Sequence, residues 1–242
     1  MHDLEGFEEL QESTLSLMDD HLALAVDLLF ESRREGYGMW RYCHLKAMSS
    51  ILHAFLALEA AINLIGYELF FDPASPGYIA PEQRAIPLQL MVRRWWSGLS
   101  WIIKLEYILS LSQGSLPPRL KQELLECARM RNWIAHGNPY KQTILLEQHF
   151  LTVGLVDREV HFDLGKFSNT KLKSPAFVDH KDAHTVNRVV LEGLKTLAFQ
   201  TQRQFVVSPM NKDEESVVID ADLNVDELLR HGPPTFEVPD VE

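Results

Sequence analysis

Residues 39–70 read "MWRYCHLKAMSSILHAFLALEAAINLIGYELF", and this stretch decides the fold class. Alanine and leucine recur throughout it, and both residues favour helices. Apolar residues would cover much of the circumference of such a helix, whereas a helix on the surface keeps one polar face. The pattern therefore predicts a long, central and largely buried helix. The whole chain of 242 residues is 46% hydrophobic, which is enough for one good-sized core.

Helical patterns also lie on both sides of this segment. Apolar spacing predicts helices over residues 7–34, with a break near Ser13, over 88–111, and over about 182–207. Residues 71–87, between the long central helix and the helix 88–111, contain four prolines. Proline lacks the amide that a helix needs, so this segment predicts a surface connection. The sequence predicts an all-α, up-and-down helical bundle.

The helix with the clearest start and stop signals is predicted from about Pro118 to His136. Gly137 follows it, in the place where a helix commonly ends in a left-handed residue, and Pro139 prevents the helix from continuing. The last two turns carry the sequence "RMRNWIAH", residues 129–136. We therefore expect a charged and polar helix end.

Two regions lie outside this helical pattern. Residues 144–163 are rich in β-branched and apolar residues and predict a small hairpin-like insertion. From residue 212 to the end the chain has ten acidic and two basic residues, with too few apolar residues for a core of its own. The expected organisation is a helical domain over 1–210 followed by an acidic, flexible tail over 211–242. The tail could occupy the basic region when no other anion is bound.

Charge and composition restrict the class of protein. The net charge of −11 argues against non-specific coating of nucleic acid, although residues 93–141 hold eight basic and three acidic residues. No uninterrupted apolar run approaches 18 residues, and the first residues are acidic, unlike a secretory signal. Cys43 and Cys127 are too few for a disulfide framework and are expected to be buried thiols. These features favour the cytoplasm and no membrane association.

Three residues in the predicted helix 118–136 have the side chains needed for phosphodiester chemistry. Arg131 is permanently charged and presents a planar set of donors that suits phosphate oxygens. His136 has an imidazole, a group that can accept or donate a proton in catalysis. Asn132, four residues before His136, shares its helix face and can position the imidazole or a substrate. This set fits RNA cleavage in which the ribose 2′-OH attacks the adjacent phosphorus.

The segment "RNWIAH", residues 131–136, resembles the R-x4-6-H signature of the HEPN superfamily (higher eukaryotes and prokaryotes nucleotide-binding). Two segments upstream are similar to the helices that precede this motif in the family: "AFLALEAAINLIGYELF" (54–70) and "IIKLEYILSLSQG" (102–114). The resemblance covers about residues 39–140. It implies an all-α bundle, a homodimer with a composite active site, and in many members a metal-independent endoribonuclease that needs no cofactor and serves as a toxin or in phage defence.

The resemblance also assigns roles to single residues. Arg131, Asn132 and His136 match the catalytic motif, whereas Glu59 and Asn63 match a polar pair that some groups place beside it. Glu59 could orient Arg131 through an ion pair. The partners expected from the resemblance are RNA, a second copy of the chain, and an antitoxin or a defence complex. The residues expected to contact RNA are Lys104, Arg129, Tyr140 and Lys141.

Other interpretations stay open at this stage. An Arg and a His near a helix end can bond the last carbonyls, so the motif could belong to an inactive HEPN module that binds nucleotide or protein. Glu59 and Asn63 could be buried polar residues that satisfy each other. His180 and His184 have a spacing that can hold a metal, but the aspartates beside them also suit a helix cap. The tryptophans of the segment 88–111 could stack on bases or belong to the core; they are Trp95, Trp96 and Trp101.

Overall fold

The computed structural model describes residues 17–33, 40–83, 98–136, 170, 172–173, 175–207 and 216–231, and the backbone of 142–144 and 160–162. The fold is all-α, as predicted. Its α-helices are α1 (Met18–Ser32), α2 (Trp40–Phe70), α4 (Trp101–Leu111), α5 (Pro118–His136), α6 (His180–Thr201) and α7 (Val225–His231). Short 3-10 helices are η1 (Pro81–Gln83) and η3 (Pro175–Phe177), and short strands are β1 (Gln142–Ile144), β2 (Val160–Phe162), β3 (Phe205–Val207) and β4 (Val217–Ile219).

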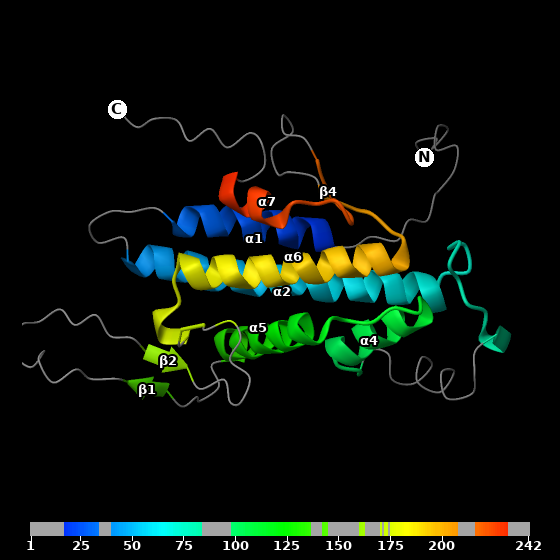
Figure 1. The fold of residues 1–242 in the computed structure, drawn as a ribbon, viewed down its shortest axis with the longest axis horizontal. Helices are drawn as coiled ribbons and strands as arrows, with labels where there is room; N and C mark the ends of the chain where they lie inside the picture. The colour runs from blue at the N-terminus through cyan, green and yellow to red at the C-terminus, as the bar shows by residue number, and fades with distance from the viewer. Residues whose placement is uncertain are drawn as a thin grey trace, which may run out of the picture.

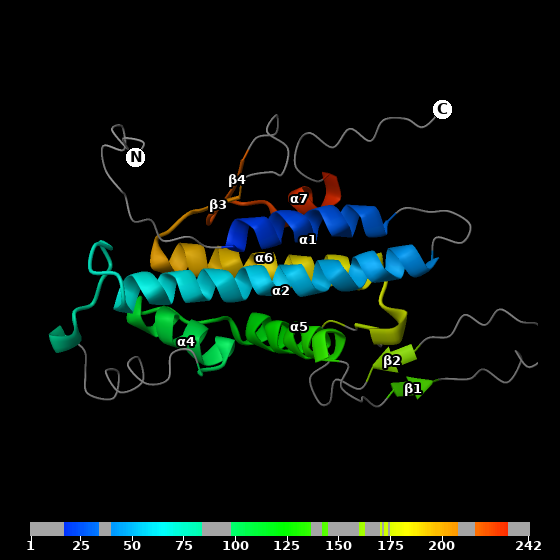
Figure 2. The ribbon, with the colours of Figure 1, turned by 180° about the vertical axis from the view of Figure 1, so that it is seen from behind.

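Helix α2 forms the centre of the bundle. Helix α6 lies beside it in the same layer, α1 packs above both, and α4 and α5 follow one another below this layer, on the side away from α1 (Figure 1, Figure 2). Along the chain, α1, α2, α5 and α6 alternate in direction (Figure 1). Small residues on α2 let its neighbours approach closely, among them the fully buried Ala47, Ala54, Ala57 and Ala61. The prediction of a long, central helix over 39–70 is confirmed.

A short chain of buried hydrogen bonds joins three of these helices. The Ser50 hydroxyl of α2 donates to the Ala25 carbonyl of α1 over 2.7 Å. The Asn187 amide of α6 donates to the Ser50 oxygen and to the Ala183 carbonyl, each over 2.8 Å. Because buried polar groups are costly without partners, this arrangement favours one register of α1, α2 and α6.

Several predicted boundaries differ from the structure. Of the predicted helix 7–34, the described part is α1, which begins at Met18. The predicted helix 88–111 is confirmed over 101–111 as α4 (Trp101–Leu111) and is wrong at residues 98–100, which lie in a turn before it. Helix α5 agrees with the prediction at both ends. The boundaries that failed lack a strong local stop signal, whereas α5 has proline before it and glycine after it.

Residues 216–231, in the predicted acidic tail, have regular structure and buried side chains that the composition of the tail does not predict. Helix α6 ends at Thr201, where Gln202 adopts a left-handed conformation, and the predicted helical residues 205–207 instead form β3. Strand β3 pairs antiparallel with β4. Ile219, Val225 and Leu229 are buried in the common core. Residues 216–231 are therefore part of the helical domain, because a few apolar side chains suffice when an existing core covers them.

The hairpin-like insertion is present at its two ends. Strand β1 pairs antiparallel with β2, with Thr143 opposite His161. Residues 145–159, between these strands, lie outside the described part. Both strands follow the C-terminal end of α5 (Figure 1).

Helix α2 also has the length and composition of a membrane span. Its best 18-residue window has a mean hydropathy of 1.6, although half of that window is buried inside the fold. Counting only uninterrupted apolar runs missed this property. The core helix of a soluble protein passes the same test, and burial against α1 and α6 accounts for the composition of α2.

Candidate functional site

Helix α5 separates the motif residues onto two sides. Its inner face buries Leu124, Cys127 and Met130. Asn132 and His136 are exposed at its C-terminal end. Since residues four apart share a helix face, the amide and the imidazole point out of the bundle together.

Arg131 points the other way, toward α2. Its guanidinium forms an ion pair with Glu59 and lies over the Phe55 ring, 4.8 Å from the ring centroid. The Arg131 side chain is 16% exposed and its Nε has no hydrogen-bond partner among the described residues. The ion pair expected between Glu59 and Arg131 is therefore present, and it holds the guanidinium against α2 rather than at the helix tip beside His136.

A second cation lies beside Glu59. Lys104 of α4 is buried, and its ammonium donates to the Asn63 amide oxygen over 2.9 Å. Burial lowers the pKa of Lys104, and the negative charge of Glu59 partly opposes that effect. Glu59, Asn63, Lys104 and Arg131 thus form one polar cluster, here called the Glu59 cluster, at the meeting point of α2, α4 and α5.

Aromatic packing closes this meeting point. Trp101, the first residue of α4, contacts Phe55 edge to face, with ring centroids 5.1 Å apart. Trp101 is half-buried and packs against the core. The core interpretation therefore holds for Trp101, whereas Trp95 and Trp96 lie outside the described residues.

The other residues expected to contact RNA differ in their position. Arg129 is exposed on α5, two residues before Arg131. Tyr140 and Lys141 lie outside the described residues. Lys104 is directed into the Glu59 cluster, so it would not contact RNA directly. It could act on RNA only through its positive electrostatic potential.

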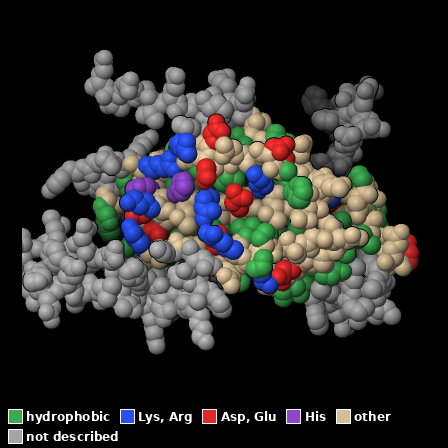
Figure 3. Space-filling model, viewed as in Figure 1, with side chains coloured by type: hydrophobic (Ala, Val, Ile, Leu, Met, Phe, Trp, Pro, Cys, Tyr) green, Lys and Arg blue, Asp and Glu red, His purple; other side chains and the backbone are tan. Residues whose placement is uncertain are grey.

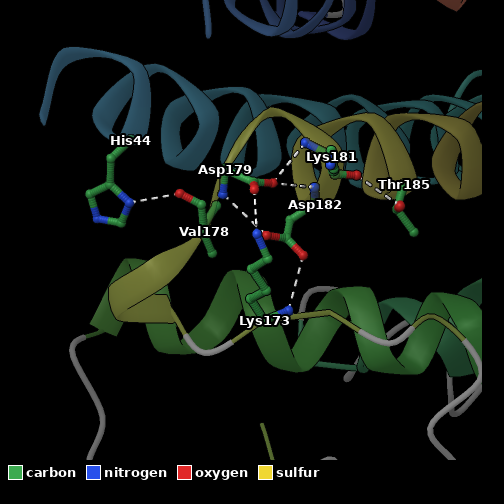
Figure 4. Close-up of polar contacts among 7 residues, drawn as sticks. All are labelled: His44, Lys173, Val178, Asp179, Lys181, Asp182 and Thr185. Carbon is green, nitrogen blue, oxygen red and sulfur yellow. Dashed lines mark hydrogen bonds and ion pairs between the residues drawn. The ribbon is translucent and has the colours of Figure 1, made fainter. Parts of the chain in front are cut away.

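The aspartates around His180 form a helix cap. Asp179 accepts from the backbone amides of Lys181 and Asp182, at 2.8 and 3.3 Å, and Asp182 accepts from those of Asp179 and Lys173, at 3.1 and 2.9 Å (Figure 4). Burial raises the pKa of Asp182 to about 6. Among the described residues no three metal-ligating side chains come together. The capping interpretation of this segment is confirmed.

Both cysteines are free thiols. Cys127 is buried in α5, and burial together with nearby carboxylates raises the pKa of its thiol well above the usual range. Cys43 is only half-buried, in contrast to the prediction. The Cys127 thiol therefore lacks the lowered pKa of a reactive nucleophile.

Two contacts between aromatic side chains were not found from the sequence. Trp40 stacks on His44 one turn further along α2, with ring centroids 5.5 Å apart and planes within 3°. The spacing of four residues could have indicated this pair. His21 of α1 and His53 of α2 meet with their Nδ1 atoms 3.1 Å apart, and burial and the charge of His21 lower the pKa of His53. Only the packing of α1 on α2 creates this second pair.

Comparison of the chain with protein-family models, with curated proteins and with solved structures finds no match in any of the three. The chemistry of the residues in α2, α4 and α5 therefore carries the functional argument.

Proposed function

We propose that this chain is a metal-independent endoribonuclease of the HEPN type. The observation that carries the proposal is the end of α5, where the Asn132 amide and the His136 imidazole are both exposed on one face of the helix. The proposed setting is the cytoplasm, in a toxin or phage-defence system with an antitoxin or a defence complex as partner.

The proposed reaction is an internal transfer at phosphorus. The ribose 2′ oxygen bonds to the adjacent phosphorus while a base takes its proton, and the bond from phosphorus to the 5′ oxygen breaks as an acid protonates that oxygen. The products are a 2′,3′-cyclic phosphate and a 5′-OH end. His136 is the proposed acid or base, and Asn132 positions the substrate. Arg131 would have to turn away from Glu59 to stabilise the charge that develops on the phosphate oxygens.

A homodimer would supply the second proton-transfer group. One His136 can act as base only if another group acts as acid, and a second copy of α5 would bring a second imidazole. Exposed apolar side chains on the helices of the Glu59 cluster support such an assembly: Leu56 and Tyr67 of α2 and Ile103 of α4. If these side chains form one continuous surface in the assembled dimer, a second copy of the chain would cover them.

The second candidate is a HEPN module without catalytic activity that binds nucleotide or protein. The inward direction of Arg131 favours it, because the guanidinium is mostly covered and already neutralised by Glu59. In that case the motif would stabilise the bundle, and His136 would contribute only to binding.

Incubation of the purified chain with total RNA in EDTA, followed by end-group analysis, tests the proposal. The unaltered chain should produce cyclic phosphate and 5′-OH ends, whereas His136→Ala should lose at least about 100-fold in rate because proton transfer contributes roughly 10²–10⁴-fold. Lys121→Gln, toward the start of α5, is the matched control and should cleave normally. Equal product from the unaltered chain and His136→Ala would exclude the proposed chemistry.

A further inference from the structure

The first turns of α2 carry an unusual surface. Residues 40–46 read "WRYCHLK", in which aromatic and basic side chains are interleaved. Trp40 is 67% exposed, the largest exposed fraction among the large apolar side chains of the described residues. Tryptophan usually buries most of its area, so an indole this exposed indicates a surface that another molecule covers.

This indole is held in place from below. One side of Trp40 rests on the His44 ring, and the two planes are nearly parallel. His44 Nδ1 lies 2.8 Å from the Val178 carbonyl oxygen, just before the cap of α6 (Figure 4). Because a carbonyl can only accept, Nδ1 donates the hydrogen and the ring orientation is fixed. Trp40 is therefore a preorganised flat platform, with its other side available for stacking.

Positive charge lies at the same end of the bundle as the platform. Arg41 is exposed beside Trp40, and Lys181 is exposed at the start of α6. Lys, Arg and His side chains, with acidic side chains among them, gather over the N-terminal part of α6 (Figure 3), where burial, together with the charges of Arg33 and Arg188, lowers the pKa of His184. This end of the molecule would attract an anion, even though the whole chain is acidic.

Two carboxylates at this end of the bundle are already paired with cations. Glu31 accepts from the Tyr42 hydroxyl over 3.2 Å and forms an ion pair with Lys46. Asp179 forms an ion pair with Lys173 and caps α6. Asp226 is the carboxylate that opposes the cations around His184. These pairings reduce the repulsion that a bound polyanion would meet.

We infer that the end of the molecule formed by the first turns of α2 and α6 binds single-stranded RNA, with one base stacked on Trp40 and phosphates near Arg41 and Lys181. A base must leave its duplex to present a free face to an indole, so the substrate is single-stranded. This inference rests on the proposed function, since α5 also ends with His136 at this end of the bundle, as both ribbon views show (Figure 1, Figure 2).

Fluorescence anisotropy of a fluorescein-labelled oligo(A) of about 12 nucleotides tests the inference, since such a length spans one typical single-strand binding surface. All variants carry His136→Ala and the buffer contains EDTA, so that binding is measured without cleavage. Trp40→Ala should raise Kd about tenfold, because stacking of one base is worth roughly 1–3 kcal/mol. Trp40→Phe should keep Kd within about threefold, since the phenyl ring still stacks.

Phe199 provides the matched control. It is 63% exposed near the far end of α6, so Phe199→Ala removes a similar exposed aromatic ring away from the platform. Phe199→Ala should leave Kd unchanged. The double variant Arg41→Gln/Lys181→Gln should weaken binding at low salt and reduce the salt dependence by about two phosphate contacts.

An abasic oligomer of the same length separates stacking from charge. Its affinity should respond to Arg41→Gln/Lys181→Gln and not to Trp40→Ala. The inference is overturned if the parent chain does not bind oligo(A), if Trp40→Ala leaves Kd unchanged, or if Trp40→Ala only dissociates a dimer in light-scattering measurements. If binding depends on Trp40 but total RNA stays uncut, the binding surface is supported and only the proposed nuclease activity is contradicted.

Discussion

Replacing Glu59 with glutamine should destabilise the fold by about 2–3 kcal/mol, more than replacing either cation of the Glu59 cluster. The carboxylate forms an ion pair with Arg131 and also attracts Lys104, so its neutralisation leaves two covered cations without their nearest anion. Removing one partner of a buried ion pair costs roughly 3–5 kcal/mol. The Glu59 side chain is 27% exposed, so solvent reduces the effect below that range.

The two cation variants provide the comparison. In Arg131→Met the carboxylate still has Lys104 nearby, and in Lys104→Met it keeps Arg131, so each should cost about 1 kcal/mol or less. The double variant Glu59→Gln/Lys104→Met should recover at least about 1 kcal/mol relative to additive behaviour, because one unpaired charge is removed. Methionine retains the packing volume of the aliphatic part of either side chain.

Urea denaturation at pH 7 and low salt, followed by circular dichroism at 222 nm, measures these free energies of unfolding. The predicted order is a larger loss for Glu59→Gln than for Arg131→Met or Lys104→Met. A loss below about 0.5 kcal/mol for Glu59→Gln, or additivity in the double variant, would refute the view that one carboxylate serves two cations.

Two further predictions concern α6 and the end of the chain. The folded-state pKa of Asp182 is raised from its ordinary 3.8 to about 6, so its stabilising effect is complete below pH 3.8 and is lost as the pH rises to about 6. Between pH 4 and pH 7 the unaltered chain should therefore lose about 2–3 kcal/mol of its free energy of unfolding relative to Asp182→Asn. Urea denaturation of both proteins at each pH measures this difference, and a difference that does not change with pH would contradict the prediction. Leu229 is fully buried although it lies in the acidic end of the chain, so Leu229→Ala should lower the free energy of unfolding by roughly 2–4 kcal/mol, whereas a loss under 1 kcal/mol by thermal denaturation would show that α7 does not share the core.

The candidate site combines local and tertiary features. Asn132 and His136 share the exposed side of α5 because helical spacing places them there, which the sequence alone predicts. The direction of Arg131 follows from Phe55 and Glu59, which belong to a helix about 70 residues earlier in the chain. A guanidinium can reach several positions from one Cα atom, so only its partners decide which position it takes.

The sequence by itself determined the all-α class and the bounds of α2 and α5. These features depend on periodicity and on capping residues within a few positions of each other, and such interactions form wherever the segment lies. Only the tertiary structure decided that residues 216–231 join the core, that Glu59 lies between two cations, and that Trp40 is fixed on His44 by the Val178 carbonyl. Each of these contacts joins residues far apart in the chain, and its free energy exists only after the helices have packed.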